Sequence, residues 1–568
     1  MKETMFCFQC QETAQGKGCK TIGVCGKKAS TAALMDGLLF VCRGIGVATT
    51  ALRKSGHPID KEVDDYLIDA LFSTVTNANF DETALMEKLH HGVAISRELQ
   101  QEAQKTGTPL PQIPELEWCM KEECPAIEKS CSTEKGCAAE KGCSEEKGSS
   151  AEKAAGNGWG IPIGVLRTED EDLRSLKELV TYGLKGMAAY MEHARNLKYD
   201  DSSINAFMQR ALSGLTVGGK DKEQLMSLVM ETGEYGVKVM RLLDKAHTET
   251  YGHPEMTKVK TSVGIRPGIL VSGHDLSDLE QLLQQSEGKE IDIYTHGEML
   301  AAHYYPLLKK YGHLKGNYGG SWWQQREDFA TFNGPILMTT NCIVPPRQGT
   351  SYAGRLFTTG SAGCPGAKHI GADAYGNKDF RTIIEMAQKC EAPEPLGDTT
   401  LTGGFGHQEM ERLMDKIVSA VKSGAIKKFV VMAGCDGRMP SREYYTAYAR
   451  QLPPDHVILT AGCAKYRYNK LALGEIEGIP RVIDAGQCND SYSLVLTVLR
   501  MRELLGLKDV NELPIIYNIA WYEQKAVLVL LTLLSVGVKN ITLGPTLPAF
   551  LSPNVKGILA KEFGIKTI

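Results

Sequence analysis

Four cysteines near the start of the chain constrain its fold more than any other feature. Cys7, Cys10, Cys19 and Cys25 form a C-x2-C-x8-C-x5-C motif within nineteen residues. Four thiolates this close in sequence can surround a single metal centre, which forces the residues between them into a tight loop. The flanking glycines let the backbone wrap closely and bring amide donors to the sulfurs. The motif therefore predicts an iron-sulfur site of the 4Fe-4S type.

The same spacing also permits a structural zinc site with four cysteine ligands. A zinc ribbon contains two C-x2-C pairs, and this segment has only one, so iron-sulfur is favoured over zinc. The whole chain has 16 cysteines. In the cytosol, where structural disulfides are rare, clustered thiols more often hold metals or carry out redox chemistry.

Composition and charge exclude several classes of function. A chain of 568 residues is expected to form about three to four domains. Its net charge of -4 leaves no basic excess for nucleic acid. The N-terminus lacks the basic and apolar regions of a secretory signal. The longest apolar stretch, Ala526 to Val538, is shorter than the roughly 20 residues that cross a bilayer, so it predicts a buried helix. We expect a cytoplasmic protein that does not bind a membrane.

Hydrophobic periodicity divides the chain into a helical part and an α/β part. From Ser30 to about Leu243 the pattern is helical, with Ser30 and Asp81 as expected helix caps. A polar, cysteine-rich insertion near 117–157 interrupts it and predicts a surface loop. After about Lys260, short β-branched runs alternate with helical segments, as in parallel α/β layers. The expected strands begin at Gly268, Ile291, Pro335, Phe429, Val457, Arg481, Ile515 and Asn540. A composition break near Pro393 to Gly404 predicts domains at 1–260, 261–400 and 401–568.

Seven reactive side chains lie at or just after the carboxyl ends of these expected strands. They are His274, Glu298, Cys342, Cys435, Cys463, Cys488 and Glu523. Ligand sites of open α/β sheets form at that edge, so one shared site is the simplest interpretation. Each residue alone also has an ordinary structural explanation as a buried thiol, a cap or a surface group. Thiolates favour iron-sulfur chemistry, whereas imidazole and carboxylate bring iron with positions open to exchange.

The sequence resembles the hybrid cluster proteins, also called prismane proteins or hydroxylamine reductases, over nearly its whole length. The resemblance rests on motifs that occur in the family's order. They are FCFQCQE, SGHD at His274, THGEM at Glu298, TTNC at Cys342, GCDGR at Cys435, GCAKYRYNK at Cys463, GQCND at Cys488 and WYEQKA at Glu523 and Lys525. It implies a helical-bundle domain followed by two Rossmann-like α/β domains with mainly parallel sheets.

The resemblance also implies the cofactors and the residues that bind them. Cys7, Cys10, Cys19 and Cys25 match the family's short-spaced pattern for a 4Fe-4S cluster. A hybrid 4Fe-2O-2S cluster is implied at His274, Glu298, Cys342, Cys435, Cys463, Cys488 and Glu523, with a persulfide on Cys435. The thiols Cys119, Cys124, Cys131, Cys137 and Cys143 of the insertion are outside the family pattern. Cys42, Cys364 and Cys390 are treated as structural thiols, although Cys364 lies in a turn that could approach the site.

The activity implied by the resemblance is reduction of hydroxylamine to ammonia and water, and in some members of nitric oxide to nitrous oxide. Electrons would come from a separate redox protein, because no dinucleotide-binding motif follows the expected strands. Lys525 is similar to the family's lysine beside the open iron position. As a hypothesis, Lys525, Glu298 and Glu523 deliver or orient the protons of the reaction.

Three other functions remain open at this point. A carbon monoxide dehydrogenase relative would contain nickel, but two glutamate ligands argue against a sulfur-rich nickel site. A nitric-oxide-responsive or nitroso-transfer protein would modify partner thiols without multiple turnovers. A purely structural zinc protein would be colourless. The sequence does not identify the physiological substrate, the electron donor or the oligomeric state.

Overall fold

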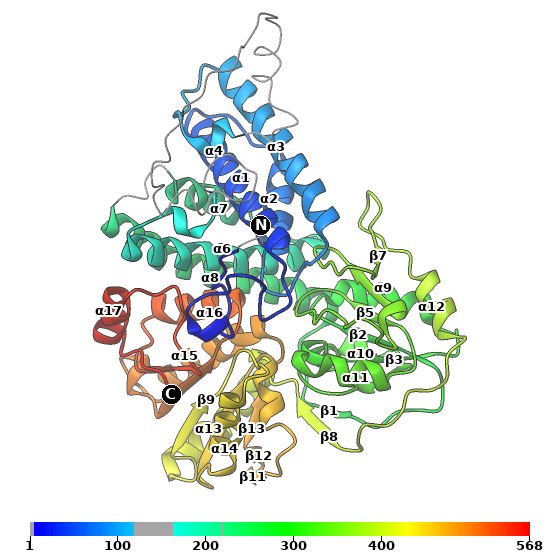
Figure 1. The fold of residues 1–568 in the computed structure, drawn as a ribbon. Helices are drawn as coiled ribbons and strands as arrows, with labels where there is room; N and C mark the ends of the chain where they lie inside the picture. The colour runs from blue at the N-terminus through cyan, green and yellow to red at the C-terminus, as the bar shows by residue number, and fades with distance from the viewer. Residues whose placement is uncertain (1–4, 119–162, 217–220) are drawn as a thin grey trace, which may run out of the picture.

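The computed structural model describes residues 5–118, 163–216 and 221–568. Helices form the upper part of the molecule in Figure 1, and two parallel sheets with their own helices lie below, on the right and on the left. The N-terminal segment lies where these three parts meet. This arrangement agrees with the predicted fold class. The cysteines of the 117–157 insertion lie outside the described residues.

Among the described residues of the helical part, four helices are long, α1 (Ala29–Lys54), α3 (Glu82–Lys105), α6 (Glu171–Asn196) and α8 (Lys222–Tyr251). The shorter helices are α2 (Lys61–Ser73), α4 (Pro114–Glu117) and α7 (Ser202–Gly214). Asp81 caps α3 as expected, because its carboxylate accepts hydrogen bonds from Thr83 N and Ala84 N. The cap predicted at Ser30 is wrong. Helix α1 begins one residue earlier, and the Ser30 hydroxyl donates to Glu82 instead.

Helix α1 is the one described helix that is long and apolar enough to cross a membrane by length and composition. However, 78% of its apolar window is buried inside the protein. The apolar stretch after Ala526 forms most of α16 (Gln524–Ser535), which is a buried helix as predicted. Helix α16 packs against α6 and α8 at very short range. A Cβ atom added to Gly233 of α8 would lie 2.2 Å from the Leu531 carbonyl oxygen, so only glycine permits this contact.

The first sheet has six parallel strands in the order β4-β3-β2-β5-β6-β7. All eight expected strands are confirmed, and three of them, β2, β3 and β5, form the middle of this sheet. Strands β4, β6 and β7 were not predicted. Their bounds are β2 (Gly268–Ser272), β3 (Asp292–Thr295), β4 (Leu314–Asn317), β5 (Ile336–Met338), β6 (Leu356–Thr359) and β7 (Lys368–Ile370). Helices α9 (Leu276–Ser286), α10 (Pro306–Lys309), α11 (Gln325–Thr331) and α12 (Arg381–Ala387) accompany the sheet.

The second sheet has five parallel strands in the order β13-β10-β9-β14-β15. All five were predicted. They are β9 (Lys428–Val431), β10 (His456–Thr460), β13 (Val482–Asp484), β14 (Ile515–Ala520) and β15 (Ile541–Gly544), accompanied by α13 (His407–Ser423), α14 (Glu443–Arg450), α15 (Ser491–Leu504), α16 and α17 (Pro553–Phe563). Two small antiparallel pairs complete the strands, β1 (Thr257–Lys260) with β8 (Thr400–Gly403) and β11 (Glu475–Ile476) with β12 (Ile479–Pro480).

The cores of the two sheets differ in extent. One continuous apolar core joins the helical part to the second sheet, with Leu528 of α16 and Met187 of α6 among its fully buried members. The first sheet has separate cores on its two faces. These apolar cores pack against the two sheets and hold the carboxyl ends of their strands in place.

Candidate metal centre

The carboxyl edges of the two parallel sheets face each other, and the seven predicted residues meet between them. Strands β2, β3 and β5 of the first sheet lead to His274, Glu298 and Cys342. Strands β9, β10, β13 and β14 of the second lead to the other four. A pocket of about 390 Å³ is lined by six of the seven, namely His274, Glu298, Cys342, Cys435, Cys463 and Glu523. The seventh, Cys488, has its sulfur within 4.8 Å of ligand atoms of His274 and Glu298.

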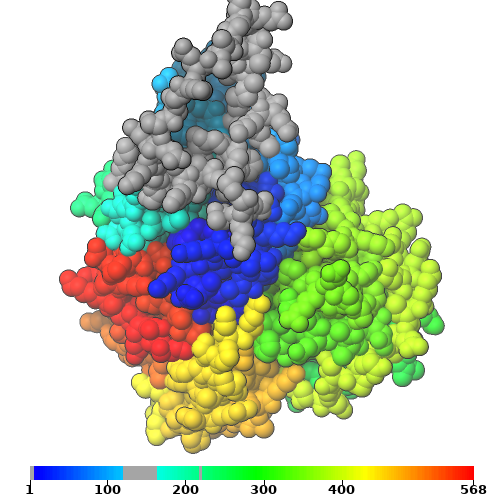
Figure 2. Space-filling view, viewed as in Figure 1, coloured from blue at the N-terminus to red at the C-terminus, as the bar shows by residue number. Residues whose placement is uncertain are grey.

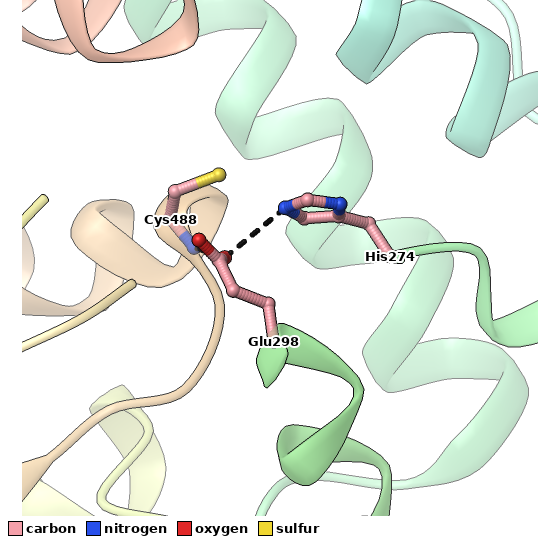
Figure 3. A group of neighbouring side chains, drawn as sticks. All are labelled: His274, Glu298 and Cys488. Atoms are coloured by element: carbon pink, nitrogen blue, oxygen red, sulfur yellow. Dashed lines mark hydrogen bonds and ion pairs between the residues drawn. The ribbon is translucent and has the colours of Figure 1, made fainter. Parts of the chain in front are cut away.

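His274, Glu298 and Cys488 lie together at the pocket, with ligand atoms within 4.8 Å of one another (Figure 3). The Nε2 atom of His274 is 3.2 Å from Oε2 of Glu298. The backbone N–H of Cys488 donates to the same carboxylate oxygen at 2.8 Å. On the far side of the imidazole ring, Nδ1 lies 2.9 Å from the Thr340 hydroxyl, which fixes the orientation of the ring. The three side chains come from β2, β3 and β13, which span both sheets.

Lys525 reaches into the same group from the first turn of α16. Its Nζ atom is 3.1 Å from His274 Nε2 and 3.1 Å from the Asn341 side-chain oxygen. It is also 3.7 Å from Oε1 of Glu523. The Glu523 carboxylate caps α16 by accepting from Lys525 N at 2.8 Å. Lys525 is only 1% exposed, so the surface position that a lysine usually takes does not apply here.

Burial governs the protonation of the thiols in the pocket. It raises the pKa of Cys435 to about 12 and, together with the nearby carboxylates, raises those of Cys342, Cys463 and Cys488 well above their ordinary value. Without a cation between them, these sulfurs would be neutral thiols at neutral pH. Bound cations reverse this preference, because coordination removes the thiol proton. The donor set is therefore suited to a positively charged cluster.

The imidazole and carboxylates respond differently to the same burial. Burial and the charge of Lys525 lower the pKa of His274 to about 4, so its ring is neutral and keeps a free lone pair. Burial alone would raise the pKa of Glu298, but His274 and Lys525 outweigh it and lower the value to about 2. Burial raises the pKa of Glu523. Burial alone would lower the pKa of Lys525, yet Cys488 and the two glutamates raise it, so the ammonium keeps its proton.

The four N-terminal cysteines are gathered in one loop that begins the chain. Cys7 and Cys19 pair through two backbone hydrogen bonds of 3.0 and 2.8 Å. Cys10 and Cys19 are buried, whereas Cys7 and Cys25 are half-buried. Burial raises the pKa of Cys10, and the charges of Cys25 and Cys7 raise it further, which reflects how close these sulfurs are. None of the described cysteines forms a disulfide.

Arg442 and Tyr522 join the N-terminal loop to the strand-end pocket. Arg442, which is fully buried, donates to Cys435 O at 2.9 Å, to Trp521 O at 2.7 Å and to Oε1 of Gln11 at 2.9 Å. The backbone N–H of Gln11 donates to Tyr522 O at 3.0 Å. Sequence reasoning missed both residues. Tyr522 could have been suspected from its place directly before Glu523, whereas nothing in the sequence pattern marks Arg442.

Further contacts hold the sulfur atoms in place. Tyr190 donates its hydroxyl to Cys488 Sγ at 3.4 Å, and Asp436 N donates to Cys463 Sγ at 3.0 Å. Cys364 instead packs with Phe80 and Tyr352 in a core of the first sheet, outside the pocket lining. The other two thiols treated as structural, Cys42 and Cys390, also lie outside this lining.

The sequence model of the Prismane/CO dehydrogenase family matches residues 5–568. The chain belongs to the prismane/CO dehydrogenase family. Among its family relatives, a hydroxylamine reductase of Porphyromonas gingivalis is 54% identical over 100% of this chain and 98% of its own length. A hydroxylamine reductase of Bacteroides thetaiotaomicron is 56% identical over 99% of this chain and 97% of its own length. A hydroxylamine reductase of Desulfovibrio desulfuricans is 53% identical over 100% of this chain and 97% of its own length.

Solved structures of the same prismane/CO dehydrogenase family share the fold. A nickel-free carbon monoxide dehydrogenase from a Thermococcus species has a TM-score of 0.53 and 16% identity, covering 99% of this chain and 88% of its own. An acetyl-CoA synthase/carbon monoxide dehydrogenase has a TM-score of 0.55 and 15% identity, covering 99% and 84%. At this identity the likeness concerns the fold alone.

Proposed function

We propose that this chain is an iron-sulfur oxidoreductase that reduces hydroxylamine to ammonia and water with electrons from a separate redox protein. The convergence of four thiols, one neutral imidazole and two carboxylates at one site carries this proposal. The full-length relatives named hydroxylamine reductase support it and favour it over nitroso transfer or a nickel enzyme.

The residues present suit two cofactors of different character. Cys7, Cys10, Cys19 and Cys25 would hold a 4Fe-4S cluster, since four thiolates in a glycine-rich loop supply the usual ligands. The mixed set at the strand ends would hold a hybrid 4Fe-2O-2S cluster, because thiolates suit sulfur-bound iron while imidazole and carboxylate suit oxygen-bound iron. In this proposal Cys435 carries the persulfide. When bound, the second cluster supplies electrons and a Lewis-acidic iron position for the nitrogen oxide.

The chain's own residues supply orientation and protons. The reaction NH2OH + 2e⁻ + 2H⁺ → NH3 + H2O needs two protons at the substrate. Lys525 keeps its proton at Nζ because of the surrounding negative groups, and Asn341 and His274 hold that atom toward the pocket. It is therefore placed to donate to the departing oxygen. Glu523, whose pKa burial raises, is a second proton carrier, while Glu298 stays ionised and orients His274.

Anaerobic turnover of the dithionite-reduced protein tests this function. We expect iron-rich protein to make one ammonia for every two electrons consumed, and nitrous oxide when nitric oxide replaces hydroxylamine. Iron, nickel and zinc are counted on the same sample. Iron-rich protein without multiple turnovers would shift the function to nitric oxide sensing or nitroso transfer. Nickel would indicate a carbon monoxide dehydrogenase type of centre. Zinc without iron would refute both proposed iron-sulfur clusters.

A further inference from the structure

The loop that carries the N-terminal cysteines is open to solvent on one face of the molecule. Figure 2 shows the start of the chain exposed at the centre of this face, between the two sheet-bearing parts. Cys7 and Cys25 are half-buried there, whereas five of the seven residues at the strand ends are buried, namely His274, Cys435, Cys463, Cys488 and Glu523. Any electron that reaches the N-terminal thiols from outside has to cross this loop.

The exposed side chains of this loop are cationic. Lys17, Lys20 and Lys28 are exposed. The only carboxylate among residues 5–28 is Glu12, which is buried and paired with Arg438 at 2.7 Å. The loop itself therefore has an excess of positive charge, although the whole chain has a net charge of -4.

The neighbouring segment of the first α/β part extends this charge. A Cβ atom added to Gly26 would lie 3.8 Å from Pro345, so the segment that contains the exposed Arg347 adjoins the loop. On the opposite side, Glu82 lies near Lys28 and offsets part of its charge. Of the exposed lysines of the loop, Lys17 and Lys20 are therefore the pair tested below.

An apolar side chain stands among these cations. Ile22 is 59% exposed, although isoleucine is one of the most frequently buried residue types. Transient protein interfaces combine an apolar centre with a polar rim that steers the partner by charge. Ile22 and the surrounding lysines have this composition.

We propose that the surface formed by residues 15–28 together with Arg347 docks an acidic ferredoxin-type electron carrier. This inference rests on the proposed function, in which the four N-terminal thiols hold an electron-transfer cluster. The carrier's acidic side chains would contact Lys17 and Lys20, and its apolar rim would contact Ile22. One electron passes per encounter, so the carrier is oxidised twice for each hydroxylamine reduced. A small, weak interface suits a carrier that has to leave after each transfer.

Binding of a purified acidic bacterial ferredoxin, in its oxidised form, to the iron-loaded protein tests the surface directly. The test variant is Lys17→Glu with Lys20→Glu. The matched control is Lys289→Glu with Lys389→Glu, because these lysines are also exposed and the change in net charge is identical. The control pair lies next to α12, away from the N-terminal loop, where Gln388 donates to Lys289 O.

We expect the Kd for the ferredoxin, measured by isothermal titration calorimetry at low ionic strength, to rise at least about tenfold in the loop variant. In the control it stays within about twofold of the unchanged protein. The difference in Kd between the loop variant and the control should become smaller at 0.5 M salt, because the Debye length falls from about 10 Å at 0.1 M to a few ångströms. In ferredoxin-driven turnover the loop variant should show a raised KM for ferredoxin, while dithionite-driven turnover is unchanged.

Two results would overturn the docking surface, namely equal Kd values for the loop and control variants, or binding that does not weaken with salt. The proposed function fails in a different way, through absent hydroxylamine turnover by the unchanged protein with dithionite. Because binding is measured without turnover, the failure of the docking surface and the failure of the proposed function are distinguishable.

Discussion

Replacing Arg442 with methionine removes one of the links between the N-terminal loop and the strand-end pocket. The guanidinium is fully buried and donates three hydrogen bonds of 2.7 to 2.9 Å, two to backbone carbonyls and one to a side-chain amide. Methionine fills much of the same volume but donates none of these bonds. Three buried acceptors from three distant parts of the chain therefore lose their donor.

The expected loss of stability follows from these contacts. A hydrogen bond from a charged donor contributes about 1.5–3 kcal/mol, so the three together contribute about 5–9 kcal/mol. Removing the cation also removes its desolvation cost, which offsets several kcal/mol. We expect the free energy of unfolding to fall by about 3–5 kcal/mol. In a cooperative unit of 150–250 residues this lowers Tm by roughly 6–20 °C.

Thermal unfolding, monitored by circular dichroism under anaerobic conditions, measures this fall in Tm. Arg450→Met is the control, because Arg450 is the last residue of helix α14, which Arg442 directly precedes, is 64% exposed and approaches Glu443 only to 3.9 Å. Exposed ion pairs of this kind contribute less than about 1 kcal/mol. A Tm for Arg442→Met within about 2 °C of that for Arg450→Met would refute the reasoning.

Three further predictions concern the proton donor, a buried acid and a helix contact. Lys525→Ala should lower kcat for hydroxylamine by about 10²–10⁴-fold at unchanged iron content, and undiminished turnover would remove its proposed role. Burial and Asp69 raise the pKa of Glu192 to about 8, so its carboxyl stays protonated in the folded protein while the unfolded chain releases the proton above about pH 4.5. The free energy of unfolding should therefore fall by about 2 kcal/mol between pH 6 and 7.5, and Glu192→Gln should abolish this part of the pH dependence of Tm. Gly233→Ala should lower Tm by several degrees, because the added methyl group collides with Leu531 O, and an unchanged Tm would show that α8 and α16 can separate at little cost.

The sequence predicted the strands best where they are buried on both faces. Apolar runs such as Gly268–Ser272, in which every residue is buried, identify a central parallel strand without reference to the rest of the chain. Strand β4 was missed because Leu314–Asn317 is short and contains lysine and glycine. The Ser30 cap was wrong because Glu82, more than fifty residues later, accepts its hydroxyl.

The seven site residues could be predicted as a set because carboxyl ends of parallel strands share an edge. Their meeting across two separate sheets is set by the packing of those sheets, which no local pattern encodes. For the same reason the partners of Arg442 were not predictable. Gln11 lies 431 positions away from it in the chain. Whether the seven residues bind the hybrid cluster stays a prediction.

The contacts of the N-terminal loop have a consequence for the assembly of the protein during synthesis. Gln11 contacts Tyr522 and Thr546, and the Gln524 side chain donates to Gln9 O, so this loop binds residues that are synthesised more than 500 positions later. At 5–20 residues per second, about 25–100 s separate their appearance. During that interval the loop that contains the N-terminal thiols lacks its contacts with the second sheet. A chain interrupted before β14 would therefore leave these thiols without the contacts that the loop makes with residues 522–546.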